Sequence, residues 1–259
     1  MKFEINQNLI IGMVHCLPLV NTKDYKNNND EILKRAIEDA VTLEKAGVGA
    51  IMVENMGDNP LKETLDHEQA IQLAVITKAI KDVVKIPVGI DAAFNDYKTS
   101  LAIAKAVGGA FVRIPVYVDT VVYHGGILYP KAVEATKYRR EIQAEDVLII
   151  ADIQVKYTYM INSEITIETS AKMAASSGAD AVIVTGLSSG NETPIEIVER
   201  VKNVVKIPVL VGSGIDEKNI KKQFSIANGA IVGSSLKEDK KIENPISFEL
   251  TKRLVDSLK

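Results

Sequence analysis

One short stretch of the chain carries side chains that could perform acid–base chemistry together. Residues 147–156 read VLIIADIQVK, a hydrophobic run that ends in Asp152, Gln154 and Lys156. Alternate residues of a strand point to the same side of a sheet, so these three polar side chains are expected to share one face. A carboxylate beside a lysine can act as an acid–base pair, or it can tune the lysine. A structural ion pair is the alternative for Asp152, and a Schiff base is a further role open to Lys156.

Other ionisable side chains end hydrophobic runs elsewhere in the chain. They are His15, Glu54, Asp91 and Arg113. We predict that His15, Glu54 and Asp91 join Asp152 and Lys156 in catalysis. Arg113 is expected to bind a substrate carboxylate or phosphate, or to pair with Asp91 or Asp152. Further candidate substrate contacts are Asn55, Asp58, Gln154 and Thr185.

Glycine and hydroxyl residues end two later hydrophobic runs. These sequences are Gly212-Ser213-Gly214 and Gly233-Ser234-Ser235. Glycines allow close backbone approach to an anion, and exposed N–H groups with serine hydroxyls can then hold it. A tight turn before a helix is the alternative for the first sequence. Two such sequences favour a phosphate site formed by Gly212, Ser213, Gly214, Gly233 and Ser234.

Short β-branched runs alternate with longer helical patterns along the whole chain, which is typical of parallel strands joined by helices. Helices are expected over 30–46 and 66–84, the second capped by Asp66 with Gln69 three residues on. A capping box at Thr193 and an Asn244-Pro245 start are expected for two later helices. The expected strands are 9–14, 50–54, 87–91, 110–114, 147–153, 181–185, 208–212 and 230–233.

Eight strand–helix units in 259 residues predict one α/β domain over 1–259, a (β/α)8 TIM barrel. A doubly wound open sheet is the alternative. A weak internal repeat favours the barrel, because each sequence pairs with one four strands away. The matching stretches are 9–11 with 148–150, 47–53 with 178–184, 83–88 with 204–209, and 109–112 with 229–232. In such a barrel the active site lies at the carboxyl ends of the strands, where the candidate residues stand.

Composition restricts the classes of function that remain. The net charge of −3 and the absence of a basic stripe argue against nucleic-acid binding. The single cysteine, Cys16, excludes an intrachain disulfide, and its position predicts a buried, unreactive thiol. No apolar run is long enough to span a membrane and no secretion signal is evident, so we expect a soluble cytoplasmic protein. We also expect that it forms a homo-oligomer.

Three further predictions concern histidines, loops and metals. His67 is expected to be exposed, and the segment 117–130, which contains His124, could form a mobile lid. No histidine or cysteine spacing typical of a metal site appears. Glu54, Asp91 and Asp152 could converge on a divalent metal, but we predict neither a metal nor another cofactor.

Several motifs together resemble the BtpA family over nearly the whole chain. They are IGMVHCLPL at 11–19, VENMGDNP at 53–60, YRRE at 138–141, ADI at 151–153, VIVTG at 182–186, VGSG at 211–214 and IVGSSLK at 231–237. The resemblance implies a TIM barrel of the phosphate-binding type. The family is named for a role in photosystem I biogenesis, and some members are labelled as nucleosidases or sugar-metabolism proteins.

The chain also departs from the family pattern. Val20-Asn21-Thr22 replaces a turn rich in proline and glycine, and residues 123–126 replace a more acidic turn. Tyr157 stands where the family tends to have histidine, so a catalytic histidine after Lys156 does not carry over.

The leading hypothesis is an enzyme that acts on a phosphorylated sugar or a nucleotide-like compound. N-glycosidic hydrolysis, aldol-type cleavage and isomerisation all use acids, bases and an anchored phosphate, so the sequence leaves the three open. The alternative is a non-catalytic assembly or stability factor that uses the barrel as a binding scaffold.

Overall fold

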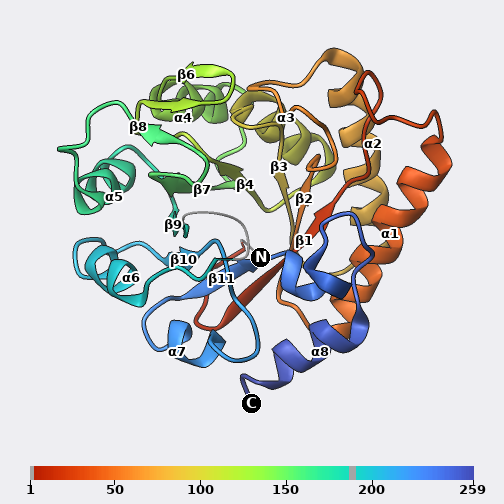
Figure 1. Ribbon diagram of the computed structural model, residues 1–259. Helices are drawn as coiled ribbons and strands as arrows, with labels where there is room; N and C mark the ends of the chain where they lie inside the picture. The colour runs from red at the N-terminus through yellow and green to blue at the C-terminus, as the bar shows by residue number, and fades with distance from the viewer. Residues whose placement is uncertain (1–2, 187–190) are drawn as a thin grey trace.

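The computed structural model describes residues 3–186 and 191–259, and within them eight parallel strands close into a barrel (Figure 1). Going around the barrel in hydrogen-bonded order, the strands are β1 (Leu9–His15), β2 (Ala50–Glu54), β3 (Val88–Asp91), β4 (Phe111–Ile114), β7 (Leu148–Ile153), β9 (Ala181–Val184), β10 (Val209–Val211) and β11 (Gly229–Val232), which returns to β1. The predicted (β/α)8 barrel is confirmed, and the expected strands agree with the observed ones to within about a residue.

Helices surround the strands, as Figure 1 shows. They are α1 (Asn29–Ala46), α2 (His67–Val83), α3 (Tyr97–Val107), α4 (Ala132–Glu141), α5 (Ile167–Ser176), α6 (Ile195–Lys202), α7 (Ile220–Phe224) and α8 (Phe248–Asp256). Two short 3₁₀ turns, Ser234–Leu236 and Glu238–Lys240, follow β11. None of the helices in the described ranges is long and apolar enough to cross a membrane.

Side chains on alternate strand positions fill the inside of the barrel, and the remaining positions pack against the helices. The interior cluster includes Met52, Phe111 and Ile150, and all three are fully buried. Gly89 provides room for the Phe111 ring, since a Cβ at Gly89 would lie 2.1 Å from a ring carbon. Aliphatic side chains dominate the larger outer cluster, which explains how the chain builds its core without tryptophan.

The helix starts follow the sequence in one case and depart from it in two. Asp66 caps α2, and its backbone N–H donates to Gln69 Oε1 at 3.0 Å. The capping box at Thr193 is wrong, because α6 is capped by Pro194 and Thr193 Oγ1 donates to the Ser213 carbonyl. The Asn244-Pro245 start is wrong as well, because α8 begins three residues later, where Ser247 Oγ accepts from the Leu250 N–H.

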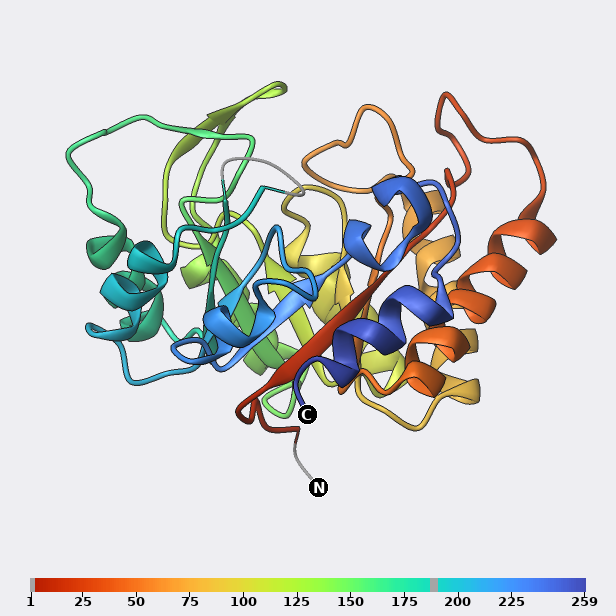
Figure 2. The ribbon, with the colours of Figure 1, turned by 60° about the horizontal axis from the view of Figure 1, so that its bottom comes forward.

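The segment 117–130 contributes to a small second sheet instead of a plain loop. It forms a hairpin of β5 (Val121–Tyr123) and β6 (Gly126–Leu128), and β8 (Tyr159–Met160) pairs with β5. In Figure 2 this hairpin rises on the side of the barrel opposite the chain termini. Val121, Leu128 and Val155 are buried together beneath the sheet. The sheet therefore joins the crossover after β4 to the loop after β7.

We expect Cys16 to resist thiol reagents in the folded protein. Its side chain is 3% exposed within the outer core, as the sequence predicted. Burial, aided by the charge of Asp58, raises the pKa of its thiol far above the usual range, so little thiolate is present to react. Titration with a disulfide reagent should give no signal at neutral pH and one thiol per chain in denaturant. Rapid reaction of the native protein would contradict this packing.

Candidate active site

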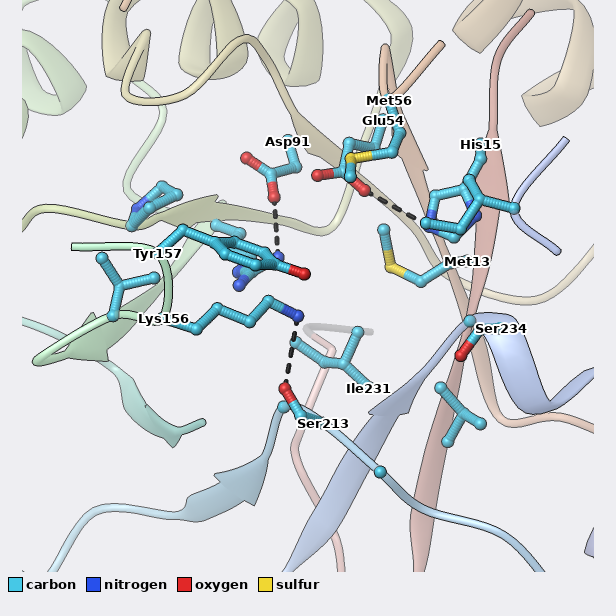
Figure 3. A pocket seen from close by; sticks show the side chains of 18 of the residues that line it. Met13, His15, Glu54, Met56, Asp91, Lys156, Tyr157, Ser213, Ile231 and Ser234 are labelled. Atoms are coloured by element: carbon cyan, nitrogen blue, oxygen red, sulfur yellow. Dashed lines mark hydrogen bonds and ion pairs between the residues drawn. The ribbon is translucent and has the colours of Figure 1, made fainter. Parts of the chain in front are cut away.

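A pocket opens at the carboxyl ends of the barrel strands, and its empty volume, open mouth included, is about 1000 Å³. Figure 3 shows Lys156 and Tyr157 reaching into it from one side, opposite His15, with Asp91 and Glu54 between them. Most of the predicted site residues line this pocket: His15, Glu54, Asp91, Arg113, Lys156, Gly212, Ser213, Gly214, Gly233 and Ser234. The strand-end prediction therefore located the pocket.

Arg113, near the end of β4, binds two carboxylates in the floor of the pocket. Its Nε and Nη2 atoms donate to both oxygens of Asp152, at 2.7 and 2.9 Å, and Nη1 donates to Asp91 Oδ2 at 3.1 Å. Burial opposes the charge of the guanidinium, but the two carboxylates outweigh it and raise its pKa above an already high value. Arg113 is thus a fixed positive charge under the pocket, and it contacts only one of the two oxygens of Asp91.

Asp91, at the end of β3, is a buried carboxyl group that favours its protonated form. Burial raises its pKa well above the usual range, and the charges of Glu54 and Asp152 add to this effect against the opposing charge of Arg113. Its Oδ1 atom is buried and has no hydrogen-bond partner within the described residues. A buried polar atom without a partner is rare, so this oxygen is an unsatisfied acceptor beside the pocket.

Glu54, on β2, is in register with Asp91, but its pKa is shifted in the opposite direction. Its Oε2 atom is 3.4 Å from Nε2 of His15, at the end of β1. Burial alone would raise the pKa of Glu54, but the His15 contact and the charges of Arg113 and Lys156 together lower it. Glu54 therefore remains a carboxylate. The Nδ1 atom of His15 is buried without a partner among the described residues, which gives the pocket a second unsatisfied polar atom.

Lys156 follows β7 and turns its amine into the pocket. Its backbone N–H donates to Thr185 Oγ1 at 3.0 Å, and its Nζ donates to Ser213 Oγ at 3.2 Å. Burial and the charge of Arg113 lower the pKa of the amine to about 8. Thr185 itself does not line the pocket, so its part is to hold the Lys156 backbone.

The loops after β10 and β11 form another wall of the pocket, next to Lys156. Ser235 Oγ donates to the Ile215 carbonyl at 2.6 Å and joins the two loops. Within the described ranges, the backbone N–H groups of Gly214, Gly233 and Ser234 donate to no protein acceptor. A Cβ at Gly233 would lie 2.8 Å from His15, so only glycine leaves that space open. Free N–H groups beside serine hydroxyls are suited to hold an anion.

Asp152 and Gln154 do not line the pocket, although the alternation of strand residues placed them there. Asp152 is fully buried beneath Arg113. Gln154 has a φ of 47°, which ends the alternation. Its N–H donates to Asp119 at 2.7 Å, and its side chain donates to the Ile165 carbonyl at 3.0 Å.

Asn55 and Asp58 are likewise turned away from the pocket and bind neighbouring loops. Asn55 donates to Asp58 at 2.7 Å and accepts from the Ala93 N–H at 2.7 Å. Asp58 accepts from the Leu19 N–H at 2.8 Å and from Gln69 at 2.7 Å. The two residues thus connect the loops that follow β1, β2 and β3. These three strands end in His15, Glu54 and Asp91.

The apolar part of the pocket was not anticipated. Met13 lies inside the barrel, whereas Met56, Leu61, Phe94 and Tyr157 come from the loops above it. Phe94 packs against Tyr123 of the hairpin, with ring centroids 5.0 Å apart. The only signal for them in the sequence is their position just after strand ends, in loops whose shape depends on distant contacts.

The acidic residues do not gather around a metal in the described part of the chain, where no group of three potential ligands is found. Asp91 and Asp152 instead face the Arg113 guanidinium, which provides positive charge between them. The other two histidines, His67 and His124, are exposed and lie outside the pocket, as expected for His67.

Solved structures with the same fold include two enzymes. Thiamine phosphate pyrophosphorylase from Pyrococcus furiosus superposes with a TM-score of 0.61 at 15% identity, covering 97% of this chain and 95% of that one. Mycobacterium tuberculosis tryptophan synthase gives 0.63 at 17% identity, covering 98% and 93%. At these identities the likeness supports the TIM-barrel fold alone.

Sequence relatives are much closer than these structures. An uncharacterized protein of Pyrococcus furiosus is 38% identical over 253 residues, covering 97% of this chain and 95% of the relative. The photosystem I biogenesis protein BtpA of Synechocystis is 35% identical over 242 residues, covering 92% and 84%. The model of the BtpA family matches residues 6–259. The chain therefore belongs to the BtpA family.

Proposed function

We propose that this protein is an enzyme that hydrolyses the N-glycosidic bond of a phosphorylated nucleoside-like compound. The observation that carries the proposal is the pair Glu54 and Asp91. The two carboxyl groups lie side by side, and their surroundings move their pKa values in opposite directions. Titratable groups separated in this way provide an acid and a base at the same pH.

The division of labour follows from these protonation states. Asp91 gives its proton to the nitrogen of the leaving base as the bond between that nitrogen and the sugar carbon breaks. The Glu54 carboxylate stabilises the positive charge that develops on the sugar and accepts a proton from the attacking water, by analogy with glycosidases. His15, 3.4 Å from Glu54, orients that carboxylate. The products are the free sugar phosphate and the protonated base.

The two walls of the pocket support a ligand with a phosphate and a flat apolar part. The N–H groups and hydroxyls after β10 and β11 would hold the phosphate, which is the usual place for one in this fold. Met56, Phe94 and Tyr157 offer an apolar surface for the base. The fold is also that of a thiamine phosphate pyrophosphorylase, whose name describes a phosphorylated ligand.

A ligand screen tests the proposal directly. The protein is incubated with nucleoside monophosphates, the matching nucleosides, and sugar phosphates. We expect a rise in melting temperature with phosphorylated compounds only, because a ligand bound to the native state stabilises it. Chromatography should then detect the free base. Ligand binding without any bond cleavage would favour the non-catalytic scaffold, and aldol-type cleavage or isomerisation would leave a different product.

We expect Gly214→Ala to abolish the stabilisation by phosphorylated ligands. Gly214 has a φ of 67°, and a Cβ there would lie 2.3 Å from the Asn191 backbone, so the loop must move. Gly108→Ala is the matched control, since Gly108 has a φ of 73° but open space around it. Both variants carry the strain of a left-handed residue, about 1–2 kcal/mol. A ligand-induced melting shift that survives in Gly214→Ala would exclude this loop from the phosphate site.

A further inference from the structure

We propose that Lys156 is an amine nucleophile that forms an imine with the carbonyl group of a phosphorylated aldehyde or ketone held in the same pocket. This inference goes beyond the proposed function. The imine would form with a ligand held by the same phosphate-binding loops, but that ligand needs no N-glycosidic bond. It adds covalent carbonyl chemistry to the site.

The position of the amine is the first argument. Lys156 Nζ lines the pocket and points toward its centre, as Figure 3 shows. Its one hydrogen bond among the described residues is to Ser213 Oγ, at 3.2 Å. Lys156 forms no ion pair within the described ranges, whereas Lys62 and Lys131 each contact a carboxylate. The amine is therefore held in place by a neutral hydroxyl that does not favour its charged form strongly.

The charge around the amine is the second argument. Four ionisable groups act on it from the strands that surround the pocket: Arg113, Glu54, Asp152 and Asp91. Burial and the positive charge of Arg113 oppose protonation of the amine, and they outweigh the charges of Glu54, Asp152 and Asp91, which favour it. The pKa of the amine is therefore lowered to about 8, which leaves a useful fraction uncharged near neutral pH.

The neighbouring groups can complete the reaction. The amine lone pair attacks the carbonyl carbon, and one proton passes from the nitrogen to the oxygen to give a carbinolamine. Loss of water then breaks the C–O bond, with a proton from the Asp91 carboxyl going to the departing oxygen and a proton leaving the nitrogen. One carbonyl compound and one amine give one imine and one water, with no change in oxidation state. Ser213, which holds the amine, belongs to the loop of the phosphate site, so a phosphate bound there places a nearby carbonyl close to Nζ.

Lys237 provides a matched comparison within the same chain. Burial lowers the pKa of its amine to about 8 as well. Its side chain, however, is 1% exposed, its Nζ donates to the Ile242 carbonyl at 2.6 Å, and it does not line the pocket. If a lowered pKa were sufficient, both lysines would react. If access from the pocket is also required, only Lys156 will react.

Borohydride trapping tests the inference. The intact protein is incubated with glyceraldehyde 3-phosphate or ribose 5-phosphate, and the hydride of borohydride reduces any imine to a stable secondary amine. We expect a mass gain equal to the carbonyl compound less one oxygen, mapped by peptide sequencing to Lys156 and not to Lys237. The yield should rise between about pH 7 and 9 and fall when inorganic phosphate competes. Unphosphorylated glyceraldehyde should label Lys156 at least tenfold less.

The result that overturns the inference is equally direct. Lys156→Arg keeps the positive charge but cannot form an imine, so it should lose the adduct. Absence of an adduct on the Lys156 peptide of the wild-type protein, with both compounds, would refute the inference even if that variant failed to fold. Because trapping does not require release of a base, its failure leaves the proposed hydrolysis to stand or fall on its own assay.

Discussion

Replacing Asp91 with asparagine is expected to lower kcat for base release by about 10²–10⁴-fold, the usual contribution of a positioned general acid. Asparagine keeps the shape of the side chain and can still accept the hydrogen bond from Arg113, but it has no acidic proton. The burial that raises the pKa of Asp91 favours the protonated, neutral form of the wild-type group. Asparagine is a close mimic of that neutral state, so the melting temperature should change little.

The pH profile separates this role from a merely structural one. In the wild type, kcat should rise with pH as Glu54 ionises, at a lowered pKa, and fall as Asp91 loses its proton, at a raised one. Asp91→Asn should lack the alkaline fall, and Glu54→Gln should lack the acid rise. A variant with full activity and an unchanged profile at Asp91 would remove it from the mechanism.

Protonation of Asp91 also makes the stability of the fold depend on pH. The direction of this dependence is opposite to that of an ordinary paired carboxylate, whose pKa is lowered by folding. Because its pKa is raised in the folded state, the native protein binds more protons than the unfolded chain between the two pKa values. The stabilisation is therefore complete below the unfolded pKa and is lost as pH rises through the folded one. Urea unfolding at a series of pH values should show a smaller pH-dependent loss in Asp91→Asn than in the wild type.

The barrel and the location of its pocket could be predicted from sequence because both follow from local patterns. Short β-branched hydrophobic runs mark the strands, and the residues that end these runs lie at one end of the barrel. His15, Glu54 and Asp91 were found in this way. The glycines after β10 and β11 were found from the same rule, since the strands there end in residues without side chains.

Departures from regular geometry could not be predicted. The alternation that placed Asp152, Gln154 and Lys156 on one face ends at Gln154, whose backbone turns to satisfy Asp119 from the preceding crossover. Asp152 sits one layer lower and faces Arg113 of the neighbouring strand. Sequence reasoning left open whether Arg113 binds Asp91 or Asp152, and the structure shows that it binds both. Such choices depend on how neighbouring strands are offset, which no single strand encodes.

Loops account for the remaining differences. The polar motif after β2 predicts contacts with a substrate. In the structure, Asn55 instead accepts from the Ala93 N–H and Asp58 from the Leu19 N–H. The small sheet of β5, β6 and β8 escaped notice because its strands are only two or three residues long. Both features depend on partners far away in the sequence, so their polar and apolar residues could not be matched in advance.

Arg113→Met is expected to produce the largest loss of stability of any change in the pocket. Methionine fills a similar volume, but it leaves the fully buried Asp152 without either of its hydrogen bonds from the guanidinium. Removing one partner of a buried ion pair costs about 3–5 kcal/mol. For a protein of this size that corresponds to a fall in melting temperature of roughly 6–20 °C. Thermal unfolding and urea titration both measure it.

The exposed pair Arg200 and Glu168 is the matched control. Arg200 also contacts a carboxylate with two nitrogens, at 2.6 and 2.9 Å, but the pair lies at the surface between α5 and α6. Water already solvates both groups, so Arg200→Met should change the melting temperature little. Equal effects of the two substitutions would mean that burial does not determine how much the Arg113 contacts stabilise the protein.

A second substitution, at Asp152, shows why Arg113→Met is unstable. If the cause is an unpaired charge, Asp152→Asn in the same chain should recover much of the lost stability, because a neutral amide costs less to bury than a carboxylate. If the cause were lost packing, Asp152→Asn would not recover the lost stability. Arg113 would then stabilise the protein by the volume that it fills beneath the pocket and not by its charge.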